Sequence, residues 1–325
     1  MYISIASYRD SFLQSTIDSA FCNADNPENL IVGCFISVLK EDPDANKFII
    51  SNDYNGRVKS EVITAGDFFS VTKCRNKALQ WLLPSHEYVL QIDSHTRFEQ
   101  GWDSKLINSY KQTNNDKCIL SCYIPGWWID DFDQEVYDEI DLNKKFYYID
   151  YNNSPSKKAF FSSYELVPDI SLKDKSENAP VKTWGMCGHF IFSNVDYFLN
   201  TIQSEWIQFW GEELYASLVA FTSGWDVYYP EYIPIRHLYP QDISENMSIK
   251  YFNNPDGPNR IWKDFSDIWF NKIKDSTDKV IDAILEKRIG GSYLGDKRSL
   301  DDLYKMIGYD IGKLIESWRD EYRNR

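Results

Sequence analysis

The strongest pattern in the chain is the stretch Tyr88-Val-Leu-Gln-Ile-Asp-Ser-His-Thr-Arg97. Residues 88–92 form a mostly apolar run with β-branched and aromatic members, which is typical of a strand buried between helices. The run stops at Asp93 and His95 follows two residues later, so on an extended chain both side chains project to the same side. Ligands of open α/β sheets collect outside the carboxyl ends of the strands. The stretch therefore predicts a ligand site at the end of a central strand.

Asp93 and His95 offer a carboxylate oxygen and an imidazole nitrogen. These atoms are ligands for a divalent cation such as Mn²⁺ (or Mg²⁺), with open positions left for substrate oxygens. The alternative is that Asp93 caps the next segment and that His95 is an ordinary polar loop residue. Position along the chain leaves both interpretations open.

Predicted strands and helices alternate on both sides of this stretch. The strands are expected at residues 3–6, 30–38, 58–64, 118–123, 224–230 and 233–239, and the helices at about 12–22, 71–83, 102–113, 195–202 and 209–222. A short strand is also expected at 47–50, and a strand interrupted by two glycines at 181–192. Such alternation indicates an α/β fold with a mostly parallel sheet covered on both faces.

The domain organisation follows from where this pattern holds. We expect one α/β domain over residues 1–245, within which 125–180 lose all periodicity and form an irregular, functional excursion. Residues 246–325 read as helices with loops and are expected to pack on that domain.

Composition excludes some classes of partner. The 325 residues include 35 basic and 49 acidic ones, a net charge of −14, which argues against nucleic acid or an anionic membrane as a general partner. No apolar run approaches the roughly 18–20 residues of a membrane helix, and the strand-like N-terminus does not resemble a secretory signal. The six cysteines lack a paired C-x-x-C framework, so we expect reduced thiols and a cytoplasmic location.

Basic residues that could receive a nucleotide occur at two places. The segment Ser7-Tyr8-Arg9 ends the first predicted strand, and Arg75 lies on the helix that starts at residue 71. Backbone amides and guanidinium groups there could bind a nucleotide base and its phosphates. The alternative is that both arginines are ordinary surface residues.

Candidates for the sugar side lie in the second half of the chain. Gly185 and Gly188 interrupt a predicted strand, and glycine at such a place often marks close approach of a ligand. Glu212 and Glu213 could hydrogen-bond sugar hydroxyls, or could simply complement the dipole of the helix that they begin. His237 ends another predicted strand, although a lone histidine is usually structural.

Several motifs, taken in order, resemble those of one protein family. The motifs are Ile3-Ser-Ile-Ala-Ser-Tyr-Arg-Asp10, Leu90-Gln-Ile-Asp-Ser-His-Thr-Arg-Phe98 with Trp102-Asp103, Phe209-Trp-Gly-Glu-Glu213, Gly224-Trp-Asp226, His237-Leu-Tyr239 and Leu294-Gly-Asp-Lys-Arg298. The family that they resemble is the GlcNAc-transferase group typified by cytoplasmic enzymes that add α-linked GlcNAc to protein hydroxyproline (glycosyltransferase family 60-like), with the polypeptide GalNAc-transferases as more distant relatives that also carry an Asp-x-His motif. The resemblance spans roughly residues 1–310 and covers 125–180 poorly.

The resemblance implies a GT-A fold, that is, a nucleotide-binding, mostly parallel sheet flanked by helices, here with a helical C-terminal extension and with 125–180 on the acceptor side. It implies that Asp93, His95 and His237 hold Mn²⁺ against the donor diphosphate. The other implied roles are nucleotide and donor contacts by Ser7, Tyr8, Arg9, Arg75 and Ser94, and contacts to the donor sugar by the Gly185–Gly188 segment and by Glu212 or Glu213.

The implied activity is metal-dependent transfer of a sugar, with GlcNAc favoured, from a UDP-sugar to a hydroxyl acceptor with retention of configuration. An extended acceptor region like that of the eukaryotic enzymes is not recognisable, which argues against hydroxyproline as the acceptor. We expect a glycan or protein hydroxyl acceptor, and the oligomeric state is open. Two alternatives remain: another metal-dependent enzyme, such as a phosphodiesterase or nucleotidyltransferase, and a sugar- or nucleotide-binding protein without turnover.

Overall fold

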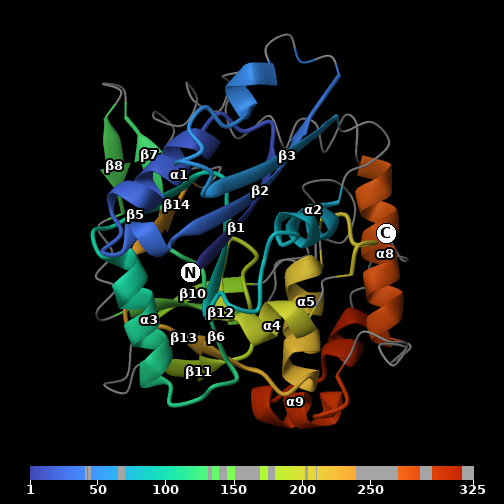
Figure 1. The fold of residues 1–325 in the computed structure, drawn as a ribbon. Helices are drawn as coiled ribbons and strands as arrows, with labels where there is room; N and C mark the ends of the chain where they lie inside the picture. Colours follow the sequence, from blue (N-terminus) through green and yellow to red (C-terminus); the bar gives the residue numbers. More distant parts are fainter. Residues whose placement is uncertain are drawn as a thin grey trace.

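The central feature of the computed structural model is an eight-stranded sheet (Figure 1). The structure describes residues 1–40, 42, 45–64, 70–130, 134–138, 145–150, 169–174, 180–201, 204–209, 211–238, 270–285 and 295–316. The strand order is β11-β13-β6-β12-β4-β1-β2-β3. The strands are β1 (Tyr2–Tyr8), β2 (Ile31–Val38), β3 (Val58–Thr64), β4 (Tyr88–Asp93), β6 (Cys118–Ser121), β11 (Val181–Thr183), β12 (Phe190–Asn194) and β13 (Asp226–Tyr229).

Most neighbours in this sheet are parallel. The run β4-β1-β2-β3 is parallel throughout, and so is the pair β6-β13. Strand β12 is inserted antiparallel between β4 and β6, and β11 is antiparallel to β13 at the edge. The parallel pairing brings the carboxyl ends of β1, β2 and β4 to one edge, where Tyr8, Val38 and Asp93 end their strands.

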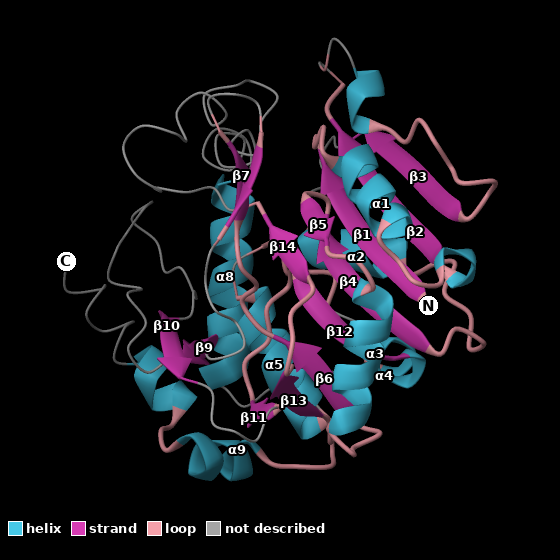
Figure 2. Ribbon diagram, turned by 90° about the vertical axis from the view of Figure 1, so that its left-hand side faces the viewer, coloured by secondary structure: helices cyan, strands magenta, loops and turns pink. Residues whose placement is uncertain are grey.

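Helices cover both faces of the sheet (Figure 2). Helices α1 (Leu13–Cys22) and α3 (Trp102–Gln112) share a buried apolar cluster with Leu90 and Ile92 of β4. Helices α4 (Val195–Asn200) and α5 (Glu212–Thr222) share a different cluster with Val89, and α2 (Val71–Ala78) packs beside Phe35. Successive residues of β4 thus serve opposite faces, as the period of a strand requires. The expected fold class, a mostly parallel α/β sheet flanked by helices, is confirmed.

Three two-stranded sheets lie outside the central one. They pair β5 (Thr96–Phe98) with β14 (Ile235–His237), β7 (Trp127–Ile129) with β8 (Glu135–Tyr137), and β9 (Lys145–Asp150) with β10 (Asp169–Asp174), all antiparallel. The last two pairs fall within 125–180, where we expected irregular chain. Their strands are too short, at three to six residues, for a period to emerge from the sequence.

Two local predictions are wrong. The strand expected at 47–50 is a 3₁₀ helix, Ala45–Phe48, whose Phe48 ring is fully buried in the core. The single strand expected at 181–192 is two strands, β11 and β12, that lie at different positions in the sheet. Residues 184–189 between them leave the sheet, and Gly185 and Gly188 lie in this break.

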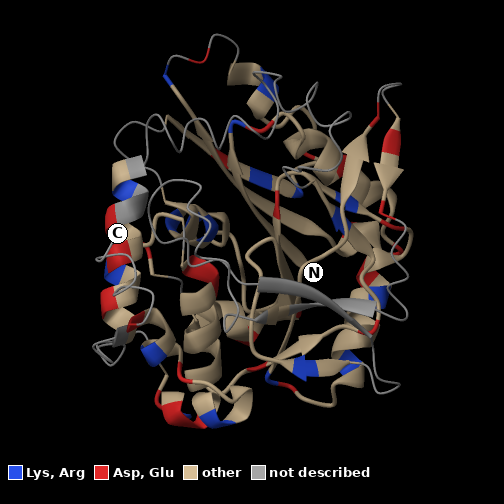
Figure 3. Ribbon diagram, turned by 180° about the vertical axis from the view of Figure 1, so that it is seen from behind, with Lys and Arg blue, Asp and Glu red and all other residues tan. Residues whose placement is uncertain are grey.

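The C-terminal region contributes helices α8 (Phe270–Leu285) and α9 (Leu300–Ile307). Val280 and Ile284 of α8 and Leu303 of α9 are buried in one apolar cluster with Leu214 and Leu218 of α5. The outer side of α8 carries charges of both signs (Figure 3). The remainder of the expected helical region, including 246–269, lies outside the described residues. Among the described helices, none has the length and apolarity needed to cross a membrane.

Candidate active site

Asp93, His95 and His237 come together at the carboxyl end of β4. Asp93 is the last residue of β4, and pairing of β14 with β5 places His237 opposite Thr96. Two backbone hydrogen bonds hold His237 there, from its N–H to the carbonyl of Pro125 (2.9 Å) and from the N–H of Leu238 to the carbonyl of His95 (3.1 Å). One ligand atom from each of the three side chains lies within 4.8 Å of the others. The predicted set is thus assembled, and its role as a metal site stays a prediction.

A buried carboxylate that we did not predict, Asp10, orients His95. Its Oδ2 lies 2.7 Å from His95 Nδ1 and accepts a hydrogen bond from Ser94 Oγ at 2.6 Å, while its Oδ1 accepts from the N–H of Phe12 at 2.8 Å. Because Nδ1 faces Asp10, Nε2 is the nitrogen left to face the cluster. Histidines that bind metals usually have such a partner on the other ring nitrogen. Asp10 lies in a quoted motif, but 85 residues separate it from His95, so no spacing rule could have found it.

The ionisation of Asp93 and His237 favours cation binding. Burial by itself would raise the pKa of Asp93, but the hydrogen bond from His237 and the charge of Arg75 hold that pKa well below its ordinary value. Burial and the neighbouring His95 lower the pKa of His237 to about 4. At neutral pH the cluster therefore presents an ionised carboxylate and, at His237, a neutral imidazole.

Burial lowers the pKa of His95 as well, but the Asp10 carboxylate more than offsets this and the net direction is upward. The same contact lowers the pKa of Asp10. His95 and Asp10 therefore behave as a charge-assisted pair, and the attraction between them fixes the plane of the imidazole.

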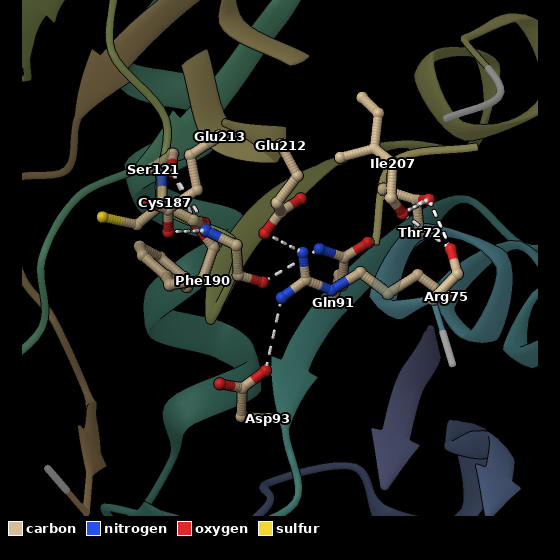
Figure 4. A network of polar contacts seen from close by, with 12 residues as sticks. Thr72, Arg75, Gln91, Asp93, Ser121, Cys187, Phe190, Ile207, Glu212 and Glu213 are labelled. Atoms are coloured by element: carbon tan, nitrogen blue, oxygen red, sulfur yellow. Dashed lines mark hydrogen bonds and ion pairs between the residues drawn. The ribbon is translucent and has the colours of Figure 1, made fainter. Parts of the chain in front are cut away.

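Arg75 links the cluster to the start of α5 (Figure 4). Its Nη2 lies 3.4 Å from Asp93 Oδ1, and its Nη1 forms an ion pair with Glu212. Arg75 is only 4% exposed, so the surface-arginine interpretation is wrong for this residue. A buried guanidinium between two carboxylates places a fixed positive charge beside Asp93.

The segment Ser7-Tyr8-Arg9 is buried at the end of β1. Arg9 is also not a surface residue, because its guanidinium pairs with the side chain of Asp42, with Nε 2.9 Å from Oδ2. The backbone of Arg9 has a positive φ of 50°, and its N–H donates to the carbonyl of Ser37 at 3.0 Å. Arg9 thus ties the end of β1 to the chain that follows β2.

Gly188 has no room for a side chain. A Cβ at this position would come within 2.4 Å of Glu212 Oε1 and 2.5 Å of the Arg75 guanidinium. The Gly188 carbonyl accepts a hydrogen bond from Gln91 Nε2 at 2.9 Å, and its N–H donates to Glu213 Oε1 at 2.7 Å. At Gly185 a Cβ would meet Ile149 at 2.7 Å. Both glycines therefore permit close packing against other residues of the chain. At Gly188 these residues are Arg75 and Glu212, which form an ion pair.

Glu213 differs from the other carboxylates of this region. Burial and the nearby Glu212 raise its pKa to about 8. At neutral pH its carboxyl group is therefore mostly protonated and can donate a hydrogen bond. Glu212 lies in the same first turn of α5 but faces the Arg75 guanidinium instead.

Other residues of the quoted motifs hold the fold. Trp102 donates from Nε1 to the carbonyl of Ala20, and Asp103 accepts from the N–H groups of Asp25 and Asn26. Arg298 binds Asp226 Oδ1 at 2.6 Å, which joins the segment before α9 to β13. Sequence reasoning did not separate these structural residues from those of the site.

The chain is similar to known proteins both in sequence and in structure. The sequence model of a family described as "Glycosyltransferase (GlcNAc)" matches residues 1–81 and 74–263. No curated protein sequence matches the chain. Among solved structures, GalNAc-T7 with UDP, GalNAc and Mn²⁺ has a TM-score of 0.45 at 14% identity and covers 74% of this chain and 44% of its own. S. aureus TarS 1–349 in complex with UDP-GlcNAc has a TM-score of 0.44 at 11% identity and covers 74% of this chain and 59% of its own.

Proposed function

Because the chain belongs to the GlcNAc glycosyltransferase family, we propose that it moves a sugar, with GlcNAc favoured, from a UDP-sugar to a hydroxyl group of a glycan or a protein. The proposed reaction depends on a divalent cation and retains the configuration of the anomeric carbon. The observation that carries the proposal is the convergence of Asp93, His95 and His237 at the end of β4, with the Arg75 guanidinium beside them.

Asp93, His95 and His237 are the proposed ligands of Mn²⁺ or Mg²⁺. One carboxylate and two imidazoles make a donor set for such ions, and the Asp10 contact preorganises one of the imidazoles. When bound, the cation would stabilise negative charge on the departing diphosphate as a Lewis acid.

Arg75 supplies positive charge of its own to the donor. Its guanidinium is fixed by Asp93 and Glu212, so it needs no reorganisation to attract the diphosphate. Ser7, Tyr8, Arg9 and Ser94 are the other proposed donor contacts, at the carboxyl ends of β1 and β4. For Arg9 the guanidinium would be shared between Asp42 and the nucleotide.

Glu212 and Glu213 are proposed to face the donor sugar rather than to act as nucleophiles. Glu212 is held by Arg75, which lowers its availability for attack on the anomeric carbon. Glu213, whose pKa is raised to about 8, is able to donate a hydrogen bond to a sugar hydroxyl. Attack of the acceptor on the face that the diphosphate leaves would retain configuration without a dedicated carboxylate base.

We also propose a cytoplasmic location. All six cysteines lie in the described part of the chain, and none of them forms a disulfide there. Thiols of this kind persist in a reducing compartment.

The test is turnover of UDP-sugars by the purified chain. We expect UDP release from UDP-GlcNAc with Mn²⁺, less from UDP-GalNAc and UDP-glucose, and none with EDTA. NMR of the product made with an accepted hydroxyl compound reads the anomeric configuration. Tight binding of UDP-GlcNAc without any UDP release would support the non-catalytic alternative, and turnover unaffected by EDTA would refute the metal site.

A further inference from the structure

A second group of ligand-type side chains lies beside the proposed manganese site. Cys187 and His189 flank Gly188 in the segment between β11 and β12, and Glu213 lies in the first turn of α5. One ligand atom from each of Cys187, His189 and Glu213 lies within 4.8 Å of the other two. We propose that these three side chains form a second metal site, which takes Zn²⁺ rather than Mn²⁺.

The backbone around this group is held in place. The N–H of Cys187 donates to Ser121 Oγ at 2.9 Å, and Cys187 forms an isolated bridge with Phe190 at the start of β12. The N–H of Gly188 donates to Glu213 Oε1 at 2.7 Å, which couples the segment to α5 (Figure 4). The second carboxyl oxygen of Glu213 is left for the ion, whose binding would release the carboxyl proton. Positions set by a sheet and a helix give a more defined site than positions on an unsupported loop.

The chemistry of the ligands selects the metal. A thiolate, an imidazole and a carboxylate are the ligand types of zinc, which commonly keeps three protein ligands and one open position. The Asp93, His95 and His237 set has no sulfur, so a cation bound there cannot give a thiolate charge-transfer band. Glu213 is the partly exposed member of the second group, whereas Cys187 and His189 are buried, so the ion enters from the Glu213 side.

The two groups are close enough to interact. The centroid of the His189 ring lies 4.9 Å from that of Tyr123 and 4.6 Å from that of His237, a proposed ligand of the first site. Two cations in neighbouring sites repel each other, so Zn²⁺ in the second site should lower the affinity of the first for Mn²⁺. Zn²⁺ would also occupy Glu213, and the site would then be inhibitory. The ligand set itself does not depend on sugar transfer and can be tested without it.

The direct test uses Co²⁺ as a spectroscopic substitute for Zn²⁺, with the full chain kept reduced by a phosphine. We expect a thiolate-to-cobalt charge-transfer band in the near ultraviolet, which Zn²⁺ removes and an excess of Mn²⁺ does not. The band should be lost in Cys187→Ser. It should persist in Cys118→Ser, a matched control, because Cys118, the first residue of β6, is as buried as Cys187 and lies outside the group.

His189→Gln is a second test of the site that does not depend on whether Cys187→Ser folds, since it keeps all six thiols. We expect its affinity for Co²⁺ at the charge-transfer band to fall by about tenfold or more. Far-ultraviolet circular dichroism checks that each variant is folded. Absence of the band in the wild-type chain, its persistence in folded Cys187→Ser, an unchanged affinity in His189→Gln, or displacement by Mn²⁺ as effective as by Zn²⁺ would each overturn the proposal. Loss of UDP-sugar turnover alone would not affect it.

Discussion

The two sides of the site hold their carboxylates in opposite electrostatic environments. Asp93, at the end of β4, faces Arg75 and His237, and its pKa lies well below the ordinary value. Glu213, on α5, lies next to Glu212, and its pKa is raised to about 8. Both are partly exposed acids of one site, and desolvation raises the pKa of each, so the charged neighbours make one a stable anion and leave the other mostly neutral. Pairs of acids separated in this way are typical of sites in which each has a different task.

The largest effect that the comparison predicts is on the anionic side. Asp93→Asn removes the charge while keeping the size, so it should lower UDP-sugar turnover by at least on the order of 10³-fold, because charge stabilisation at the departing group is lost. Steady-state release of UDP measures this. Asp196→Asn, at an exposed acid of α4, is the matched control and should behave as the wild type. Normal turnover of folded Asp93→Asn would show that the charge of Asp93 is not needed for sugar transfer, and that Asp93 and Glu213 do not have the different tasks proposed here.

A smaller loss is expected on the neutral side. Glu213→Gln retains a hydrogen-bond donor but alters its geometry at the proposed sugar contact, and we expect turnover to fall on the order of 10²-fold. The fall should appear mainly in kcat, with the affinity for Mn²⁺ little changed. If instead Mn²⁺ affinity drops while kcat at saturating metal is preserved, Glu213 belongs functionally with Asp93.

The hydrogen bond that orients His95 can be weakened without changing any of the three proposed metal ligands. Asp10→Asn leaves a polar group beside His95 but removes the charge that holds Nδ1, so Mn²⁺ should bind about 10–100-fold more weakly. Isothermal titration with Mn²⁺ gives this affinity directly. Turnover at saturating Mn²⁺ should largely recover, and failure to recover would assign Asp10 more than a positioning role.

The smallest expected effect is on the pH dependence of the free energy of unfolding. Glu213 and Asp93 contribute to this dependence with opposite signs. Glu213 has a folded pKa of about 8 against an ordinary pKa of 4.5, so the folded state binds more protons between these pH values and stability falls as pH rises through them. Asp93 has a lowered folded pKa, so its contribution to stability is present above its ordinary pKa of 3.8 and is lost on acidification. Urea unfolding at several pH values measures both trends. Glu213→Gln should make the free energy of unfolding fall less steeply with pH between about pH 5 and pH 8. An unchanged slope of that free energy with pH would show that Glu213 is not neutral in the folded protein.

Much of the framework was predictable because its signals are local. Strands β1 to β4 and helices α1, α3 and α5 were expected close to their observed bounds, since apolar periodicity reports which face of an element is buried. Helix α2 ends at Ala78, before the expected residue 83 and before Pro84. The interruption of 181–192 by two glycines was expected, but the close approach of Arg75 and Glu212 to Gly188 was not, because these residues are distant in sequence.

The sequence by itself determined the alternating α/β architecture and the projection of Asp93 and His95 to one side, since both follow from spacings within one element. Only the tertiary structure decided that Asp10 holds His95 from 85 residues away and that His237 lies opposite Thr96. It also decided that the guanidinium of Arg75 pairs with Asp93 and not with Glu213. The physical reason is that periodicity encodes which side chains are buried. Strand order and helix packing decide which partner holds a charged group or an imidazole. These partners cannot be inferred from the number of residues between them along the chain.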